Sequence, residues 1–144
     1  MYPMFAYGMN TNLMSMARRC PAARCLGNAR IQNYRLRFAV HADIVPQANS
    51  VVEGVLWQVT DQCIKSLDIA ESYPWYYDKK IITASHNGED VDVLVYVMTG
   101  QTADSAPGMG YYQMCMEGYL ENGVSTVQLS SALDKRLKSQ YTMV

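Results

Sequence analysis

Two runs of strand-forming residues flank a dipeptide that favours a tight turn. The runs are "YYDKKIITAS" (76–85) and "VDVLVYVM" (91–98), and Asn87-Gly88 lies between them. A two-residue hairpin turn needs positive φ angles, which asparagine and glycine adopt most readily. Strands joined by such a turn run antiparallel. The sequence therefore predicts an antiparallel pair of strands here.

The rest of the chain alternates strand-like and helix-like segments around this hairpin. Apolar or alternating runs predict strands at 3–8, 29–40 and 51–59, and helical periodicity predicts helices at 13–19, 61–72, 110–123 and 127–139. The order is β-α-β-β-α-β-β-α-α. It favours an α+β fold with a mixed or antiparallel sheet.

Capping residues mark where two of these helices begin. One of Asn10, Thr11 and Asn12 is expected to cap the first helix with its side-chain oxygen. Ser125 and Gln128 form the pattern S-x-x-Q, which predicts a capping box at the start of the last helix.

Size and charge limit the kind of protein this is. The 144 residues suit a single domain, 1–144, and 49% of them are hydrophobic while 17% are charged. The net charge of −1 favours neither a nucleic acid nor a membrane surface as partner. The arginines form no long basic block and are expected on solvated faces: Arg18, Arg19, Arg30, Arg35 and Arg37.

The cysteines, the termini and the histidines indicate a cytoplasmic protein without a metal. The first residues lack the basic region and the long apolar core expected of a signal peptide, and no run approaches the roughly 18 apolar residues of a membrane span. Cys20, Cys25, Cys63 and Cys115 are therefore expected to be free thiols in a reducing compartment. The tripeptide at 41–43, His-Ala-Asp, is expected to be a capped or exposed turn rather than a pair of metal ligands.

Glu71 is the first candidate for chemistry. It lies at the end of an amphipathic helical segment and just before Tyr73, Trp75, Tyr76 and Tyr77. Burial among these rings would raise its pKa from about 4.3 towards neutrality, as a general acid or base requires. The alternative is a solvent-facing glutamate beside a structural aromatic cluster.

A glycine corner at the end of the first strand is the second candidate. In "FAYGMNTN" (5–12), Gly8 allows the backbone to approach a ligand closely. The residues after it enter a helix, where unpaired N–H groups can bind a carboxylate or a developing oxyanion. The alternative is an ordinary strand-to-helix turn with capping asparagines.

Four segments in order resemble the gamma-glutamylcyclotransferase-like family over roughly residues 4–124. They are "FAYGMN", "VEGVLWQVT", "LDIAESYPWYY" and "PGMGYY…EGYLENGV". The family's patterns at these places are Tyr-Gly-Ser-Asn, Gly-x-Leu-Tyr, Leu-Asp-x-x-Glu before a tyrosine, and Pro-Ser-x-x-Tyr. The resemblance implies that family's mixed β-sheet or barrel with flanking helices.

The resemblance also implies a site. The catalytic glutamate falls on Glu71, and the family's tyrosine after it falls on Tyr77, with Tyr76 as an offset alternative. The substrate-binding residues implied are Tyr7, Gly8, Met9, Asn10, Tyr77 and Tyr111. Three positions depart from the patterns: Met9 and Gly108 replace serines, and Trp57 replaces a tyrosine.

The implied reaction is the release of 5-oxoproline from a small γ-glutamyl amine, amino acid or peptide, with a role in glutathione metabolism. The α-amine attacks its own γ-carbonyl, and Glu71 serves as general acid and base. This chemistry requires no metal, nucleotide or redox cofactor. Because Met9 and Gly108 lack the hydroxyls of the patterns, a catalytically silent binding or protein-interaction module on the same fold is the alternative.

Overall fold

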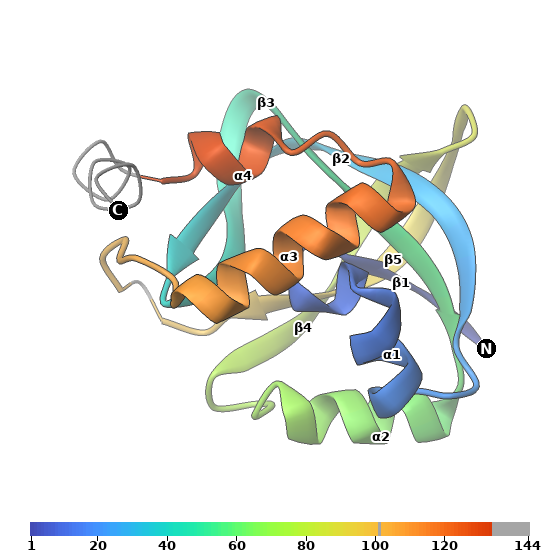
Figure 1. Cartoon of the computed structure of the whole chain (residues 1–144). Helices are drawn as coiled ribbons and strands as arrows, with labels where there is room; N and C mark the ends of the chain where they lie inside the picture. The colour runs from blue at the N-terminus through green and yellow to red at the C-terminus, as the bar shows by residue number, and fades with distance from the viewer. Residues whose placement is uncertain (101, 134–144) are drawn as a thin grey trace.

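Five strands close into a β-barrel in the spatial order β1-β3-β2-β4-β5 (Figure 1). The computed structural model describes residues 1–100 and 102–133. The strands are β1 (Tyr2–Ala6), β2 (Arg24–Ala39), β3 (His41–Val59), β4 (Tyr77–His86) and β5 (Glu89–Met98). Neighbouring strands pair antiparallel, except β1 and β5, which pair parallel. The predicted α+β fold, a mixed barrel with flanking helices, is confirmed.

Two hairpins make up most of the barrel. Asn87 and Gly88, with φ angles of 52° and 81°, turn β4 into β5, as predicted. The other hairpin joins β2 to β3 at Val40, whose φ is 64°. Both of its strands are longer than the sequence predicts, and residues 41–43, which were expected to form a capped or exposed turn, belong to β3 together with residues 44–50. Pairing with β2 brings residues 41–46 into the sheet.

The helices lie outside the barrel, with α1 next to α2 and α3 next to α4 (Figure 1). They are the 3₁₀ turn η1 (Met9–Thr11), α1 (Leu13–Arg19), α2 (Asp61–Ala70), α3 (Met109–Asn122) and α4 (Val127–Ser131). Asn12 caps α1, because its side chain accepts a hydrogen bond from the Ser15 amide at 3.1 Å. One of the three candidate caps is therefore confirmed.

The predicted capping box at α4 is wrong. Gln128 does not reach back to the helix start, because its amide nitrogen donates to the Glu53 carbonyl and to the Tyr119 hydroxyl, each at 2.7 Å. These bonds join α4 to β3 and α3, so tertiary contacts take the side chain away from the local pattern. Residues 134–139 of the predicted helix lie outside the described residues.

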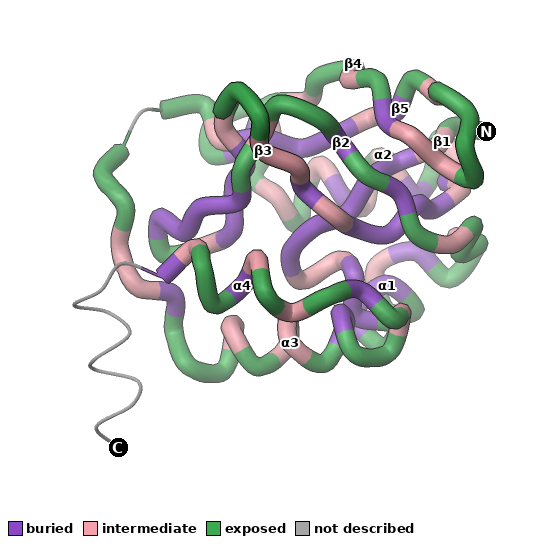
Figure 2. Tube along the Cα trace, turned by 90° about the horizontal axis from the view of Figure 1, so that it is seen from above, coloured by how far each residue is buried: buried purple, intermediate pink, exposed green. Residues whose placement is uncertain are grey.

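Buried residues alternate with exposed ones along much of the strands, while the tips of the two hairpins are exposed (Figure 2). Helix α3 packs directly on the corner that follows β1. A Cβ at Gly118 would overlap the Thr11 side chain and stand 2.6 Å from the Asn12 nitrogen. The buried Tyr119 donates its hydroxyl to the Tyr7 carbonyl. The close approach of α3 therefore holds the corner in place.

Arg37 does not lie on a solvated face, contrary to the sequence expectation. It is 6% exposed and pairs with the buried Asp43 at 3.0 Å. It also donates to Asp104 at 3.0 Å and to the Thr102 carbonyl at 2.6 Å. The arginine thus ties the segment after β5 to the hairpin of β2 and β3. The local sequence gave no sign of this, because the partners lie on β3 and in the segment after β5.

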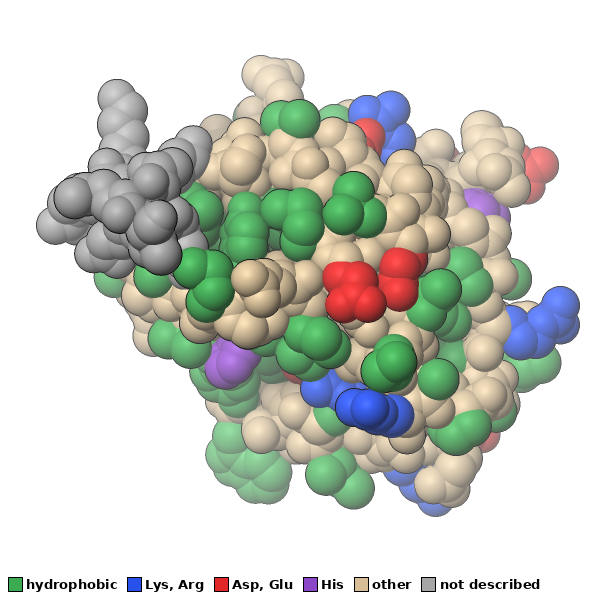
Figure 3. Space-filling view, viewed as in Figure 1, with side chains coloured by type: hydrophobic (Ala, Val, Ile, Leu, Met, Phe, Trp, Pro, Cys, Tyr) green, Lys and Arg blue, Asp and Glu red, His purple; other side chains and the backbone are tan. Residues whose placement is uncertain are grey.

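The face of the molecule in Figure 3 carries charges of both signs in small separate groups, with apolar side chains between them. The exposed apolar residues of α3 and α4 include Leu120 and Val127. In the described ranges no helix has the length and apolarity to cross a membrane. All four cysteines fall within those ranges, and each is a free thiol.

Candidate active site

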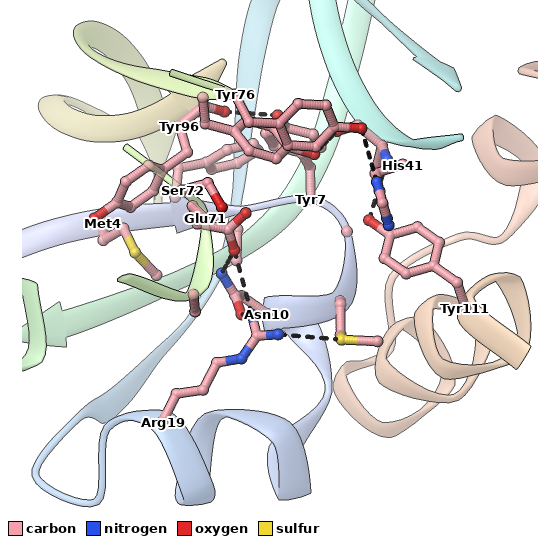
Figure 4. A pocket seen from close by; sticks show the side chains of 17 residues that line it. Met4, Tyr7, Asn10, Arg19, His41, Glu71, Ser72, Tyr76, Tyr96 and Tyr111 are labelled. Carbon is pink, nitrogen blue, oxygen red and sulfur yellow. Dashed lines mark hydrogen bonds and ion pairs between the residues drawn. The ribbon is translucent and has the colours of Figure 1, made fainter. Parts of the chain in front are cut away.

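One cavity of about 320 Å³ lies where the end of β1, the corner, the end of α2 and the start of α3 meet (Figure 4). The structure brings every site residue predicted from the sequence to its wall: Tyr7, Gly8, Met9, Asn10, Glu71, Tyr77 and Tyr111. The lining also includes side chains that the sequence did not single out as site residues: Arg19, His41, Ser72 and Tyr96. The roles of all these residues in binding and catalysis stay predictions.

Glu71 directly follows α2, and its side chain is turned into the cavity. That side chain is 15% exposed, so the solvent-facing alternative is wrong. Its Oε1 accepts hydrogen bonds from Asn10 Nδ2 at 3.1 Å and from Arg19 Nη1 at 3.2 Å. The residue therefore faces the corner across the same small space.

Two opposing influences act on the Glu71 carboxyl. Burial raises its pKa, because the charged form loses contact with water. The charge of Arg19 and the hydrogen bonds from Arg19 and Asn10 lower the pKa, because they stabilise the carboxylate. Burial is the larger effect, and the pKa lies above its ordinary value. A carboxyl group of this kind is suited to both accept and return a proton.

The corner is closely packed at Gly8. A Cβ at this position would stand 3.0 Å from the Cβ of Ala42 and 3.1 Å from the Tyr111 hydroxyl. The carbonyl of Gly8 is occupied by the amide and hydroxyl of Thr11. Within the described chain, the amides of Met9 and Asn10 donate to no protein acceptor. Such amides can bind an anion or an oxyanion that enters the cavity.

The two tyrosines implied by the family pattern both bind the backbone of Ala42. Tyr77 donates its hydroxyl proton to the Ala42 carbonyl at 2.6 Å, and the Ala42 amide donates to the Tyr111 oxygen at 3.0 Å. Burial raises the pKa of both phenols well above the ordinary value, so both stay neutral. Because the Tyr77 proton is engaged, Tyr77 can offer a ligand only an acceptor.

His41 is a cavity residue that the sequence placed wrongly. It opens β3 rather than an exposed turn, and its Nδ1 lies 2.8 Å from the Tyr76 hydroxyl. Its ring meets Tyr111 edge to face, with centroids 4.9 Å apart. Burial lowers the pKa of His41, so the neutral imidazole is favoured. Tyr76, the alternative to Tyr77 in the family pattern, packs edge to face on the Tyr77 ring. Both tyrosines line the cavity.

The sequence also placed Arg19 wrongly, on a solvated face. It lies at the end of α1, its Nη1 donates to Asn10 Oδ1 at 2.7 Å, and its Nη2 lies 3.5 Å from the sulfur of Met9. No spacing relates it to Glu71, because the contact depends on α1 packing against α2. In the described part of the chain, no group of three or more His, Cys, Asp or Glu side chains could hold a metal ion.

The barrel has the fold of gamma-glutamyl cyclotransferases. It superposes on a solved gamma-glutamyl cyclotransferase with a TM-score of 0.82 at 20% identity, over 99% of each chain. A mouse AIG2-like protein superposes with a TM-score of 0.60 at 23% identity, over 74% of this chain and 80% of the mouse chain. Residues 4–114 match the family "Gamma-glutamyl cyclotransferase, AIG2-like", and the chain belongs to that family. Human gamma-glutamylcyclotransferase is 29% identical, over 83% of this chain and 71% of the human protein.

Proposed function

We propose that this protein is a gamma-glutamylcyclotransferase that releases 5-oxoproline from a γ-glutamyl amine, amino acid or peptide. One observation carries the proposal: the partly desolvated carboxyl of Glu71 and the residues of the glycine corner line the same small cavity. The family membership and the similarity to the human enzyme support it.

The reaction needs a proton carrier, and Glu71 is the candidate. The carboxylate takes a proton from the α-ammonium of the substrate, and the freed amine nitrogen attacks the γ-carbonyl carbon. A new C–N bond forms and the carbonyl electrons move onto oxygen. Glu71 then returns the proton to the leaving nitrogen as its bond to carbon breaks. The carboxylate finally takes the surplus proton of the ring nitrogen and releases it to solvent. Such acid–base help typically contributes about 10²–10⁴ in rate.

The corner has the complementary task of stabilising negative charge. The tetrahedral intermediate carries an oxyanion, and amide donors that are already oriented stabilise such a charge without reorganisation. The amides of Met9 and Asn10 are the candidates for this role. The aromatic wall formed by Tyr77 and Tyr111 excludes water and holds the substrate in the folded conformer that cyclisation needs.

A second function is favoured by Met9. Its thioether lines the cavity where the family pattern has a serine, and its sulfur lies against Arg19. A site that reads its substrate through that hydroxyl would lose turnover and keep only binding. In this alternative the chain is a sensor or binding module for a γ-glutamyl compound.

The test is release of 5-oxoproline from a panel of γ-glutamyl amines, amino acids and peptides. Glu71→Gln is nearly isosteric and removes the proton carrier, so we expect it to abolish release. Glu117→Gln is the matched control, because Glu117 is exposed on α3. Equal release by wild type and Glu71→Gln would overturn the role of Glu71. Saturable binding of a panel compound without any release would favour the binding module.

A further inference from the structure

The two oxygens of the Glu71 carboxyl have different surroundings. Oε1 accepts from both Asn10 and Arg19, at 3.1 and 3.2 Å. No described residue donates a hydrogen bond to Oε2. Figure 4 shows this second oxygen turned away from Arg19 and Asn10, towards the tyrosines of the cavity. One oxygen is therefore anchored and the other is open to a ligand.

The anchor is a closed triangle of three side chains from three parts of the chain. Arg19 Nη1 also donates to Asn10 Oδ1 at 2.7 Å, so the Asn10 amide presents its nitrogen to Glu71. The backbone of Asn10 is held in turn, because its carbonyl accepts from Trp57 Nε1 at 3.0 Å. Each side of the triangle restricts the other two, and the carboxyl has little freedom to rotate.

We propose that Arg19 is a positioning residue: together with Asn10 it holds Oε1 of Glu71, which leaves Oε2 as the oxygen that exchanges the proton with the substrate. This inference rests on the proposed function for its catalytic meaning.

Arg19 also acts on Glu71 through its positive charge, which lowers the pKa of the carboxyl. The titratable groups that face Glu71 or share its cavity come from every surrounding element: Tyr7 after β1, Arg19 on α1, His41 on β3, Tyr76 and Tyr77 at β4, Tyr96 on β5 and Tyr111 on α3. Burial keeps the tyrosines neutral and favours neutral His41. Among the described residues of the cavity, Arg19 is thus the cation whose charge opposes the rise in the Glu71 pKa that burial causes.

Replacing Arg19 should change both the charge and the geometry of Glu71. An opposite charge within about 4–6 Å typically lowers a carboxyl pKa by about 1–3 units. Because Arg19 is partly exposed, we expect Arg19→Gln to raise the Glu71 pKa by about one unit, the low end of this range. Arg19→Lys keeps the charge and loses the planar fork, so the pKa should move little while kcat falls.

The experiment measures the Glu71 pKa directly, by NMR titration of the ¹³C-labelled side-chain carboxyl, and in parallel the pH profile of 5-oxoproline release. Arg18→Gln is the matched control, because Arg18 is the exposed neighbour on the same helix. We expect Arg19→Gln to shift the Glu71 pKa and the acidic limb of kcat/KM upwards together, and Arg18→Gln to shift neither. A purely structural role would lower the melting temperature without moving the Glu71 pKa.

An unchanged Glu71 pKa in Arg19→Gln would overturn the inference. If that variant does not fold, Arg19→Lys decides instead, since undiminished kcat in Arg19→Lys would show that the guanidinium does not orient the carboxyl. If wild type releases no 5-oxoproline, the proposed function fails. The NMR titration still tests whether Arg19 controls Glu71, so the two failures are distinguishable.

Discussion

The hydroxyl of Tyr111 lies so close to Gly8 that a methyl group at position 8 would stand 3.1 Å from the tyrosine oxygen. The same hydroxyl accepts the amide proton of Ala42. The first turn of α3, the start of β3 and the corner after β1 therefore meet at one point of the cavity wall. A side chain at position 8 would require Ala42 or Tyr111 to shift by a few tenths of an ångström.

Gly8→Ala tests this contact. Moving Tyr111 or Ala42 by even a fraction of an ångström widens the cavity beside the corner, and misplacement of about 1 Å can cost about 10²-fold in rate. We expect kcat/KM for 5-oxoproline release to fall by about 10- to 100-fold. Gly110→Ala is the control, because nothing lies within 4 Å of a Cβ there. Full activity in Gly8→Ala would show that the close approach is not needed.

Gly118→Ala tests the packing of α3 on the corner. The added methyl would overlap the Thr11 side chain and crowd the backbone amide of Asn12. Both residues are buried. Overpacking of this kind costs about 1–3 kcal/mol of unfolding free energy. Urea denaturation measures it, again with Gly110→Ala as control, where alanine should be neutral or stabilising. A urea midpoint for Gly118→Ala equal to that of wild type would contradict the close packing of α3 on the corner.

Glu71→Gln should change how stability depends on pH. The folded pKa of Glu71 is raised above the unfolded value, so between the two values the native state holds the proton more tightly than the unfolded state. The contribution of Glu71 to stability therefore decreases as pH rises from the unfolded pKa through the folded pKa. Thermal melts across that window should show Glu71→Gln gaining stability relative to wild type as pH increases. A difference that stays constant with pH would contradict the raised pKa.

Arg37→Met should strongly destabilise the protein. It would leave the buried carboxylate of Asp43 without its cation, and breaking a buried pair in this way typically costs about 3–5 kcal/mol. Arg35→Met on the same strand is exposed and should change stability little. Chemical denaturation of both variants makes the comparison. Equal midpoints for the two would show that Arg37 contributes no more than a surface arginine.

Local sequence patterns were enough to predict those elements whose signals lie within a few residues of one another. Asn87-Gly88 required a hairpin, and Asn12 could cap α1 because its own side chain reaches the next turn. The position of Glu71 near a helix end and the glycine corner were also readable. The order of the family motifs along the chain indicated the fold. Residues of these motifs also line the cavity.

Other features depended on contacts across the barrel. Residues 41–46 are strand because β2 pairs with them, and Gln128 leaves its capping position because Glu53 and Tyr119 bind it. Arg37 is buried because Asp43 and Asp104 compensate its charge. In each case the partner is on another element, and a local pattern holds no information about it.

The amino-acid order alone thus established a mixed α+β chain with a candidate acid at position 71 and a glycine corner at position 8. Tertiary packing decided that the two share a cavity and that Arg19, 52 residues from Glu71, binds the same carboxyl oxygen as Asn10. The physical reason is that capping and turn formation are satisfied within a few residues. Burial and charge pairing depend on which distant segments the barrel brings together.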